Sequence, residues 1–248
     1  MTSSGLARPA RALAIAAHPD DIEFGCGATL AKWAAGGCEV SHLVCTDGSK
    51  GTWDAEADTA ELVRVRQAEQ RAAAAALGGT GEVVFLGRLD GELEADRETT
   101  SELARWIRVL RPDVVLGHDP WKRYRLHPDH RAAGYLTVDA IVAARDPHFF
   151  REHGVAQHRP EALLLFEADA PDHCEDVTDH AEAKIAALLA HESQFETTMK
   201  IGPGRSRKAA TERAEFRDRI ERDFTEAASW AGLPDGRLAE RFKLIQPL

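Results

Sequence analysis

The chain of 248 residues has few cysteines and no long apolar run. Its four cysteines show no C-x-x-C spacing, which argues against a disulfide framework and against a sulfur-ligated zinc site. No apolar stretch is long enough to span a bilayer, and residues 1–5 do not resemble the start of a signal peptide. We therefore expect a soluble, cytoplasmic protein that does not bind membranes.

Positive charge is also in deficit. The 31 lysines and arginines are outnumbered by 41 aspartates and glutamates, which gives a formal net charge of −10. Because nucleic-acid binding needs a basic face, we expect no nucleic-acid partner. A full Gly-x-Gly-x-x-Gly turn is missing as well: His18 to Asp21 stand where a dinucleotide site would carry it. This disfavours a non-catalytic nucleotide-binding module.

Short apolar runs alternate with helix-forming stretches along most of the chain. The apolar runs, read as strands, are residues 13–17, 39–45, 82–86, 113–117 and 162–166. The helical stretches are residues 28–35, 57–77, 99–110, 131–144, 178–191 and 209–231. Such alternation predicts an α/β, Rossmann-like three-layer sandwich with a mostly parallel sheet of order 3-2-1-4-5. Edge strands complete it, one of them at residues 241–245.

The length fits one domain over residues 1–248. Its core is expected over about residues 11–190, followed by a C-terminal helical elaboration over about residues 191–248. Glycines at positions 25 and 27 are expected to free the backbone before the first helix.

Two His-Pro-Asp motifs follow apolar strands. The first is His18-Pro19-Asp20-Asp21, and the second is His127-Pro128-Asp129-His130. One such motif is often only a turn with a helix cap. Two copies, each between a strand and a helix, favour a metal site, because ligands of open parallel sheets bind beyond the carboxyl ends of the strands. The predicted order places the first and fourth strands side by side, which brings the motifs together.

Two imidazoles and one carboxylate form a suitable ligand set for catalytic zinc. We assign this role to His18, Asp21 and His130. Asp20, adjacent to a ligand, is expected to accept the proton of the metal-activated water as general base.

His127 lies three residues before His130, so both side chains can point to one side of the helix. If protonated, His127 can stabilise the oxyanion of a tetrahedral intermediate and pass a proton to the leaving amine. Asp129 is the candidate to orient the His127 ring. The remaining histidines, among them His42, His118 and His191, are expected to be ordinary core or surface residues, or receive no role.

These motifs resemble those of the PIG-L superfamily of zinc-dependent N-deacetylases. That superfamily includes N-acetylglucosaminylphosphatidylinositol deacetylases and the bacterial enzymes of mycothiol and bacillithiol synthesis. The similarity is carried by residues 17–23, 25–27, 46–48 and 127–131, and it spans most of residues 11–190. The resemblance implies the same roles that the residues suggest: ligation by His18, Asp21 and His130, base action by Asp20, and acid or oxyanion duty for His127 with Asp129 behind it.

The resemblance also points to three substrate contacts. Asp47 and Arg66 stand close to the sugar-binding rim of the family, although Asp47 can equally stabilise its own turn and Arg66 can be a solvated helix charge. Arg125 stands where some relatives have a tyrosine that polarises the substrate carbonyl. It can supply a positive donor, recognise a carboxylate or phosphate, or face solvent.

Together these features predict a metal-dependent hydrolase that removes the N-acetyl group from an N-acetylglucosamine-type amino sugar or glycoside. Zn²⁺ is the expected cofactor, and Fe²⁺ or another divalent metal stays open because availability decides the ion as much as the ligands do. The alternative keeps the site but makes the protein an amidase on a thiol conjugate or another acyl amide of secondary metabolism. A small-molecule substrate is the expected partner, and self-association into a homo-oligomer stays open.

Overall fold

The computed structural model describes residues 3–202, 204 and 206–248, which form a layered α/β fold. Its described strands make one eight-stranded sheet of order β1-β7-β8-β6-β5-β2-β3-β4. The strands are β1 (Ser3–Ser4), β2 (Arg11–Ala16), β3 (Glu39–Thr46), β4 (Val83–Arg88), β5 (Val114–His118), β6 (Ala162–Phe166), β7 (His173–Asp176) and β8 (Ala239–Ile245). The α-helices are α1 (Asp21–Ala35), α2 (Thr59–Ala76), α3 (Arg97–Leu110), α4 (Pro128–Arg145), α5 (Ala181–Leu189) and α6 (Arg207–Trp230).

The parallel half of the sheet confirms the predicted order. Strands β4, β3, β2, β5 and β6 pair in parallel in that sequence, which is the order 3-2-1-4-5 of the apolar runs. Strand β2 is buried on both faces, because Leu13 and Ile15 contact one core cluster while Ala12 and Ala14 contact another. Such a strand reads as an uninterrupted apolar run, which is why the sequence reveals it.

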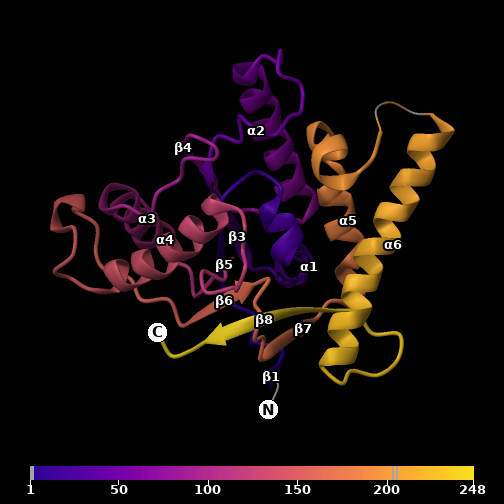
Figure 1. Cartoon of the computed structure of the whole chain (residues 1–248). Coiled ribbons are helices and arrows are strands. Elements are labelled where there is room, and N and C mark those ends of the chain that lie inside the picture. The colour runs from indigo at the N-terminus through magenta and orange to yellow at the C-terminus, as the bar shows by residue number, and fades with distance from the viewer. Residues whose placement is uncertain (1–2, 203, 205) are drawn as a thin grey trace.

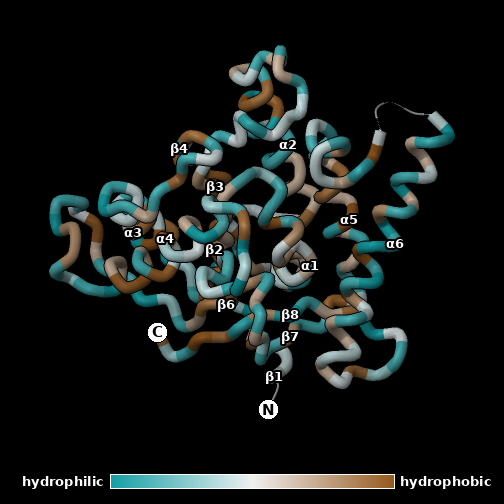
Figure 2. Tube along the Cα trace, viewed as in Figure 1, coloured by the Kyte–Doolittle hydropathy of each residue, from teal (hydrophilic) through white to brown (hydrophobic). Residues whose placement is uncertain are grey.

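Helices cover both faces of the sheet. Figure 1 shows α3 and α4 on one side and α1, α5 and α6 on the other, in agreement with one core cluster on the first side and two on the second. Helix α6 is mostly hydrophilic in Figure 2, and only a few of its apolar side chains pack inward, among them Phe216, Ile220 and Phe224. No helix of the described ranges has both the length and the apolar character that a membrane crossing requires.

Two expectations about individual elements were wrong. The strand expected at an edge, residues 241–245, is β8, and it lies inside the sheet, antiparallel to both β6 and β7. Strand β7, which lies between β1 and β8, has the polar sequence His-Cys-Glu-Asp, which gives no apolar signal.

The first helix begins at Asp21 instead of residue 28, with a kink where Cys26 leaves helical geometry. Gly25 is needed for close packing, since a Cβ there would lie 2.6 Å from the ring of Phe166.

Candidate metal centre

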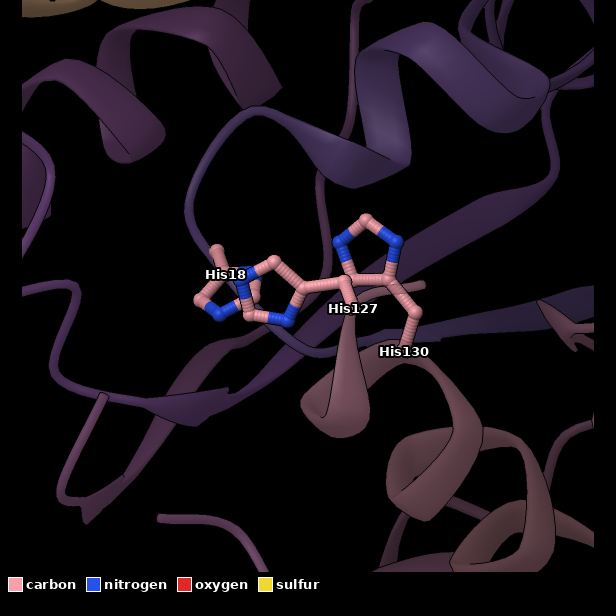
Figure 3. A group of neighbouring side chains, drawn as sticks. All are labelled: His18, His127 and His130. Atoms are coloured by element: carbon pink, nitrogen blue, oxygen red, sulfur yellow. The ribbon is translucent and has the colours of Figure 1, made fainter. Parts of the chain in front are cut away.

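Three imidazoles meet at the carboxyl ends of β2 and β5. His18 comes from the turn after β2, while His127 and His130 come from the start of α4 (Figure 3). The ring centroids of His18 and His127 lie 4.6 Å apart, those of His127 and His130 4.7 Å, and those of His18 and His130 5.2 Å. The neighbouring strands therefore bring together motifs that are separated by about a hundred residues.

Asp21 joins the two motifs through its two carboxylate oxygens. Oδ1 lies 3.2 Å from Nε2 of His130, and Oδ2 lies 3.2 Å from Nδ1 of His18. The backbone N–H of His18 also donates to Oδ2, at 2.8 Å, which fixes the carboxylate in the turn. Each predicted ligand thus lies beside another, and the carboxylate stands between the two rings.

The donor types in this cluster suit a divalent transition metal. Several overlapping groups of described residues hold candidate ligand atoms within 4.8 Å of one another: His18, His127 and His130; Asp21, His118 and His130; and His18, Asp90 and Asp129. Imidazole nitrogens and carboxylate oxygens are the ligands that catalytic zinc and iron sites use. The residues present therefore fit a metal of this kind.

The second ring nitrogen of His18 is held by carboxylates. Nε2 lies 3.0 Å from Asp129 Oδ2 and 3.2 Å from Asp90 Oδ1. Asp129 is itself fixed by two backbone N–H groups of residues 91–93, at 2.6 and 3.2 Å. Burial alone would lower the pKa of His18, but its hydrogen bonds to Asp129, Asp21 and Asp90 raise the pKa well above the ordinary value. The surroundings of His18 thus favour positive charge.

Asp129 was expected to orient His127, and the structure shows a different contact. Its carboxylate binds His18, whereas only its backbone N–H reaches His127, donating to Nδ1 at 3.3 Å. His127 therefore caps α4. Burial and the neighbouring His18 and His130 lower the pKa of His127, which favours a neutral ring. With Nδ1 accepting a bond, the proton is on Nε2, so His127 can act as a neutral hydrogen-bond donor.

Asp20 is buried beside the cluster in an unusual backbone conformation. Its φ of 95° lies in the left-handed region that few residues other than glycine adopt. Burial is the main cause that raises the pKa of Asp20, to about 7, with Asp21 adding to the rise and Arg66 opposing it. A carboxyl group in this range can accept and return a proton near neutral pH.

His118, the last residue of β5, belongs to the cluster although the sequence analysis gave it no role. It is buried, and its Nε2 lies 3.4 Å from Asp21 Oδ2. Arg125 donates to Nδ1 of His118 at 3.0 Å and to Glu167 at 2.8 Å. Arg125 is buried and orients His118, while its ion-pair partner Glu167 is partly exposed. The contact of Arg125 with substrate stays a prediction. The sequence did offer one signal for His118: it ends β5, the strand next to β2, at the edge of the sheet where ligands bind.

Asp90 was missed for a related reason. It follows β4, whose carboxyl end lies at the same edge of the sheet, and it contacts Nε2 of His18 at 3.2 Å. Its second oxygen accepts the backbone N–H of Lys50 at 3.0 Å. No histidine or proline accompanies Asp90 in the sequence, so only its place after the strand marks it.

Asp47 and Arg66 both hold turns together. Asp47 accepts the backbone N–H of Ser49 at 2.9 Å, as a turn-stabilising aspartate does. Arg66 is only 3 % exposed, so it is not a solvated helix charge. Its guanidinium donates to the carbonyl oxygens of Gly48 and Pro19, at 2.8 and 2.7 Å.

Two cavities open from the cluster, and Asp20, Asp21 and His130 line both of them. The smaller cavity, of about 370 Å³, is also lined by His127 and Trp53. The larger, of about 900 Å³, extends to α6. Both cavities therefore give access to the cluster.

The fold and the cluster together define a Rossmann-like α/β protein with a histidine and carboxylate centre fit for a divalent metal. Residues 13–141 match the PIG-L family, described as GlcNAc-PI de-N-acetylase. The chain belongs to this family.

Two relatives are similar to the chain in sequence. The chain is 38 % identical over 188 residues to the diacetylchitobiose deacetylase of Thermococcus kodakarensis, with coverage of 75 % of this chain and 70 % of the relative. It is 32 % identical over 244 residues to the 1D-myo-inositol 2-acetamido-2-deoxy-alpha-D-glucopyranoside deacetylase of Actinosynnema mirum, covering 80 % and 85 %.

Among solved structures, N,N'-diacetylchitobiose deacetylase from Pyrococcus horikoshii superposes with a TM-score of 0.83 at 28 % identity, covering 96 % of this chain and 85 % of that one.

Proposed function

We propose that the protein hydrolyses the acetamide of an N-acetylglucosamine-type amino sugar or glycoside, releasing acetate and a free amine. The observation that carries this proposal is Asp21, which stands between the imidazoles of His18 and His130 with Asp20 beside it. The three relatives named above are deacetylases whose names specify acetylated amino sugars. They do not favour the alternative, an amidase on thiol conjugates.

We propose that His18, Asp21 and His130 hold the metal, with Zn²⁺ as the best match to the donor set. His18 would bind through Nδ1, because Nε2 already contacts Asp129 and Asp90. A ligating histidine typically donates its second N–H to a carboxylate in this way. A divalent ion bound there polarises the amide carbonyl and acidifies a water molecule. Fe²⁺ is accepted by the same ligand types, and metal analysis of the protein purified from its host decides between them.

The remaining roles follow from the geometry. Asp20 accepts a proton from the attacking water and delivers it to the departing nitrogen as the C–N bond breaks. His127, whose Nε2–H is free of the helix cap, donates a hydrogen bond to the oxygen that gains charge when water adds to the amide carbon. The lowered pKa of His127 means that a neutral ring fills this donor role, in place of the protonated ring expected from the sequence.

We propose that the smaller cavity binds the sugar. Its volume of about 370 Å³ falls within the range of small-molecule sites. Trp53 lines it and is 80 % exposed, so its ring is available for contact with a sugar face. The larger cavity would then receive the other part of a glycoside.

The test is an acetate-release assay on N-acetylglucosamine, N,N'-diacetylchitobiose and an N-acetylated thiol conjugate. Metal-stripped protein should be inactive, and Zn²⁺ should restore release from the amino sugars. Asp20→Asn should retain the metal and lose turnover by about 100-fold or more. Preferential hydrolysis of the thiol conjugate would instead establish the alternative. Self-association stays a prediction, for sedimentation analysis to decide.

A further inference from the structure

The backbone of Asp20 is held in its left-handed conformation from outside its own turn. A φ of 95° is unfavourable for an L-residue, although aspartate tolerates it better than most. Rotation of the Pro19-Asp20 peptide group by half a turn would bring φ to about −85° (95° minus 180°), which is an ordinary value. That rotation would also move the backbone nitrogen of Asp20 and so tilt its Cα–Cβ bond, which displaces the carboxylate. Some contact must therefore oppose the rotation.

Helix α2 grips both polar atoms of this peptide group. Arg66 Nη2 donates to the carbonyl oxygen of Pro19 at 2.7 Å. Gln70 Oε1 accepts the N–H of Asp20 at 3.0 Å. Arg66 and Gln70 are four residues apart, so they project from the same side of the helix. A rotated peptide group would exchange its C=O and N–H and lose both bonds.

Gln70 is in turn fixed by a buried cluster below the turn. Its Nε2 donates to Glu23 Oε1 at 2.8 Å and contacts Nδ1 of His42 at 3.2 Å. Burial lowers the pKa of His42, so the ring is neutral and Nδ1 can accept. Glu23 also meets His191 Nε2 at 3.3 Å. These contacts set the orientation of the Gln70 amide, with its oxygen toward Asp20.

We propose that Gln70, anchored by Glu23, is a positioning residue that locks the Pro19-Asp20 peptide group and so aims the Asp20 carboxylate at the reacting water. This inference rests on the proposed function, since it assumes that Asp20 is the base. Gln70 and Glu23 are both 0 % exposed and line neither cavity described above, so neither side chain contacts a substrate bound there.

The first test is Gln70→Met, which keeps the length of the side chain and removes both polar atoms. The expected result is a kcat lower by about 100-fold, because a displacement of about 1 Å at a catalytic group has effects of that size. KM and metal content should stay close to wild type. A crystal structure of the variant should show Asp20 with a negative φ. Gln67→Met, one turn earlier on α2 and outside the cluster, is the matched control with unchanged kcat.

The second test exchanges the two partners. In the double variant Glu23→Gln with Gln70→Glu, the new carboxylate can accept the Asp20 N–H with one oxygen and the new amide with the other. The number of buried charges is conserved, so this variant is informative even if Gln70→Met fails to fold. We expect positive φ at Asp20 and recovery of most of the kcat. Retention of kcat in a folded exchange variant whose residue 70 no longer contacts the Asp20 N–H would overturn the proposal.

The turnover of Asp20→Asn, compared with the kcat and crystal structure of Gln70→Met, separates this proposal from the proposed function. If Asp20→Asn keeps full turnover, Asp20 is not the base and the proposed roles fail, whatever Gln70 does. If Asp20→Asn is inactive but Gln70→Met has wild-type kcat, or keeps φ of Asp20 positive, then only the positioning role is refuted.

Discussion

Two buried charged regions of this protein differ in how their carboxylates are balanced. On β8, Glu240 binds Lys184 of α5 at 2.7 Å, and on β7, Glu175 binds Lys32 of α1 at 2.8 Å. At the ends of β2 and β5, the aspartates mainly face imidazoles, and the guanidinium of Arg66 lies 3.8 Å from Asp20 and 4.0 Å from Asp90. The first region carries its own cations, whereas the second can accept one from outside.

The difference shows how similar residues serve stability in one place and chemistry in another. A buried carboxylate is costly unless it is paired and hydrogen-bonded. Glu240 achieves this with Lys184 and the backbone N–H groups of Ala28 and Thr29, at 3.2 and 2.8 Å. Asp21 instead contacts the imidazoles of His18 and His130 and the backbone N–H of His18. An imidazolium can release its proton when a metal binds, which a lysine ammonium in an ion pair does not readily do.

The largest effect on stability should come from breaking the Lys184–Glu240 pair. Lys184→Met leaves the buried Glu240 carboxylate without its cation, which should lower the free energy of unfolding by about 3–5 kcal/mol. Urea denaturation measures the loss. The double variant Lys184→Met with Glu240→Gln should recover most of it, and an equal loss in single and double variants would refute this account of the pair.

Asp129→Asn should weaken metal binding without removing a ligand. If Asp129 orients His18, the affinity for Zn²⁺ should fall by about 10–100-fold, as observed when the partner of a ligating histidine is lost. Competition with a chelator measures the affinity. Unchanged affinity together with a lower kcat would return Asp129 to the role that the sequence suggested, the orientation of His127.

Glu175 should make the folded state sensitive to acid. Burial opposes its charge, but hydrogen bonds from His173, the Leu6 N–H and Lys32 lower the pKa of Glu175 below its ordinary value. A lowered carboxylate pKa stabilises the fold above the unfolded-state pKa of about 4.3, and the contribution disappears as pH falls through the folded-state value. Between pH 6 and pH 3, the free energy of unfolding of Glu175→Gln should therefore fall by about 1–2 kcal/mol less than that of the wild type. An identical decline in both proteins, measured by urea denaturation, would contradict this.

Trp53→Ala should give the smallest effect. Loss of the aromatic face that lines the smaller cavity should raise KM for an N-acetylglucosaminide by about three- to tenfold and leave kcat nearly unchanged. Trp121→Ala is the control, because Trp121 is also exposed but packs against Tyr135. If both variants behave alike, Trp53 has no special place in sugar binding.

The features of the fold and site that depend on local sequence pattern could be predicted. The fully buried strands are apolar runs, and the two His-Pro-Asp motifs stand at strand ends, so the parallel order and the meeting of His18 with His130 could be predicted. Strand β7 could not, because its stability comes from pairing with β1 and β8 and its residues are polar.

Contacts that depend on tertiary packing could not be predicted from local sequence patterns. Gln70 lies in an alanine-rich helix, where nothing in the sequence tells which side meets the Pro19-Asp20 turn. The partner of Asp129 also depends on how α4 sits against the turn after β2. His118 is the exception, since the rule that located His18 applies equally to the end of β5.

The central claim is that His18, Asp21 and His130 bind one divalent ion. A crystal of the protein soaked with Zn²⁺ and measured with anomalous scattering tests it most directly. We predict a single strong peak at about 2.0–2.2 Å from His18 Nδ1, an Asp21 oxygen and His130 Nε2. A peak held by Asp90 and Asp129 without Asp21, or no peak in protein that deacetylates its substrate, would contradict the account.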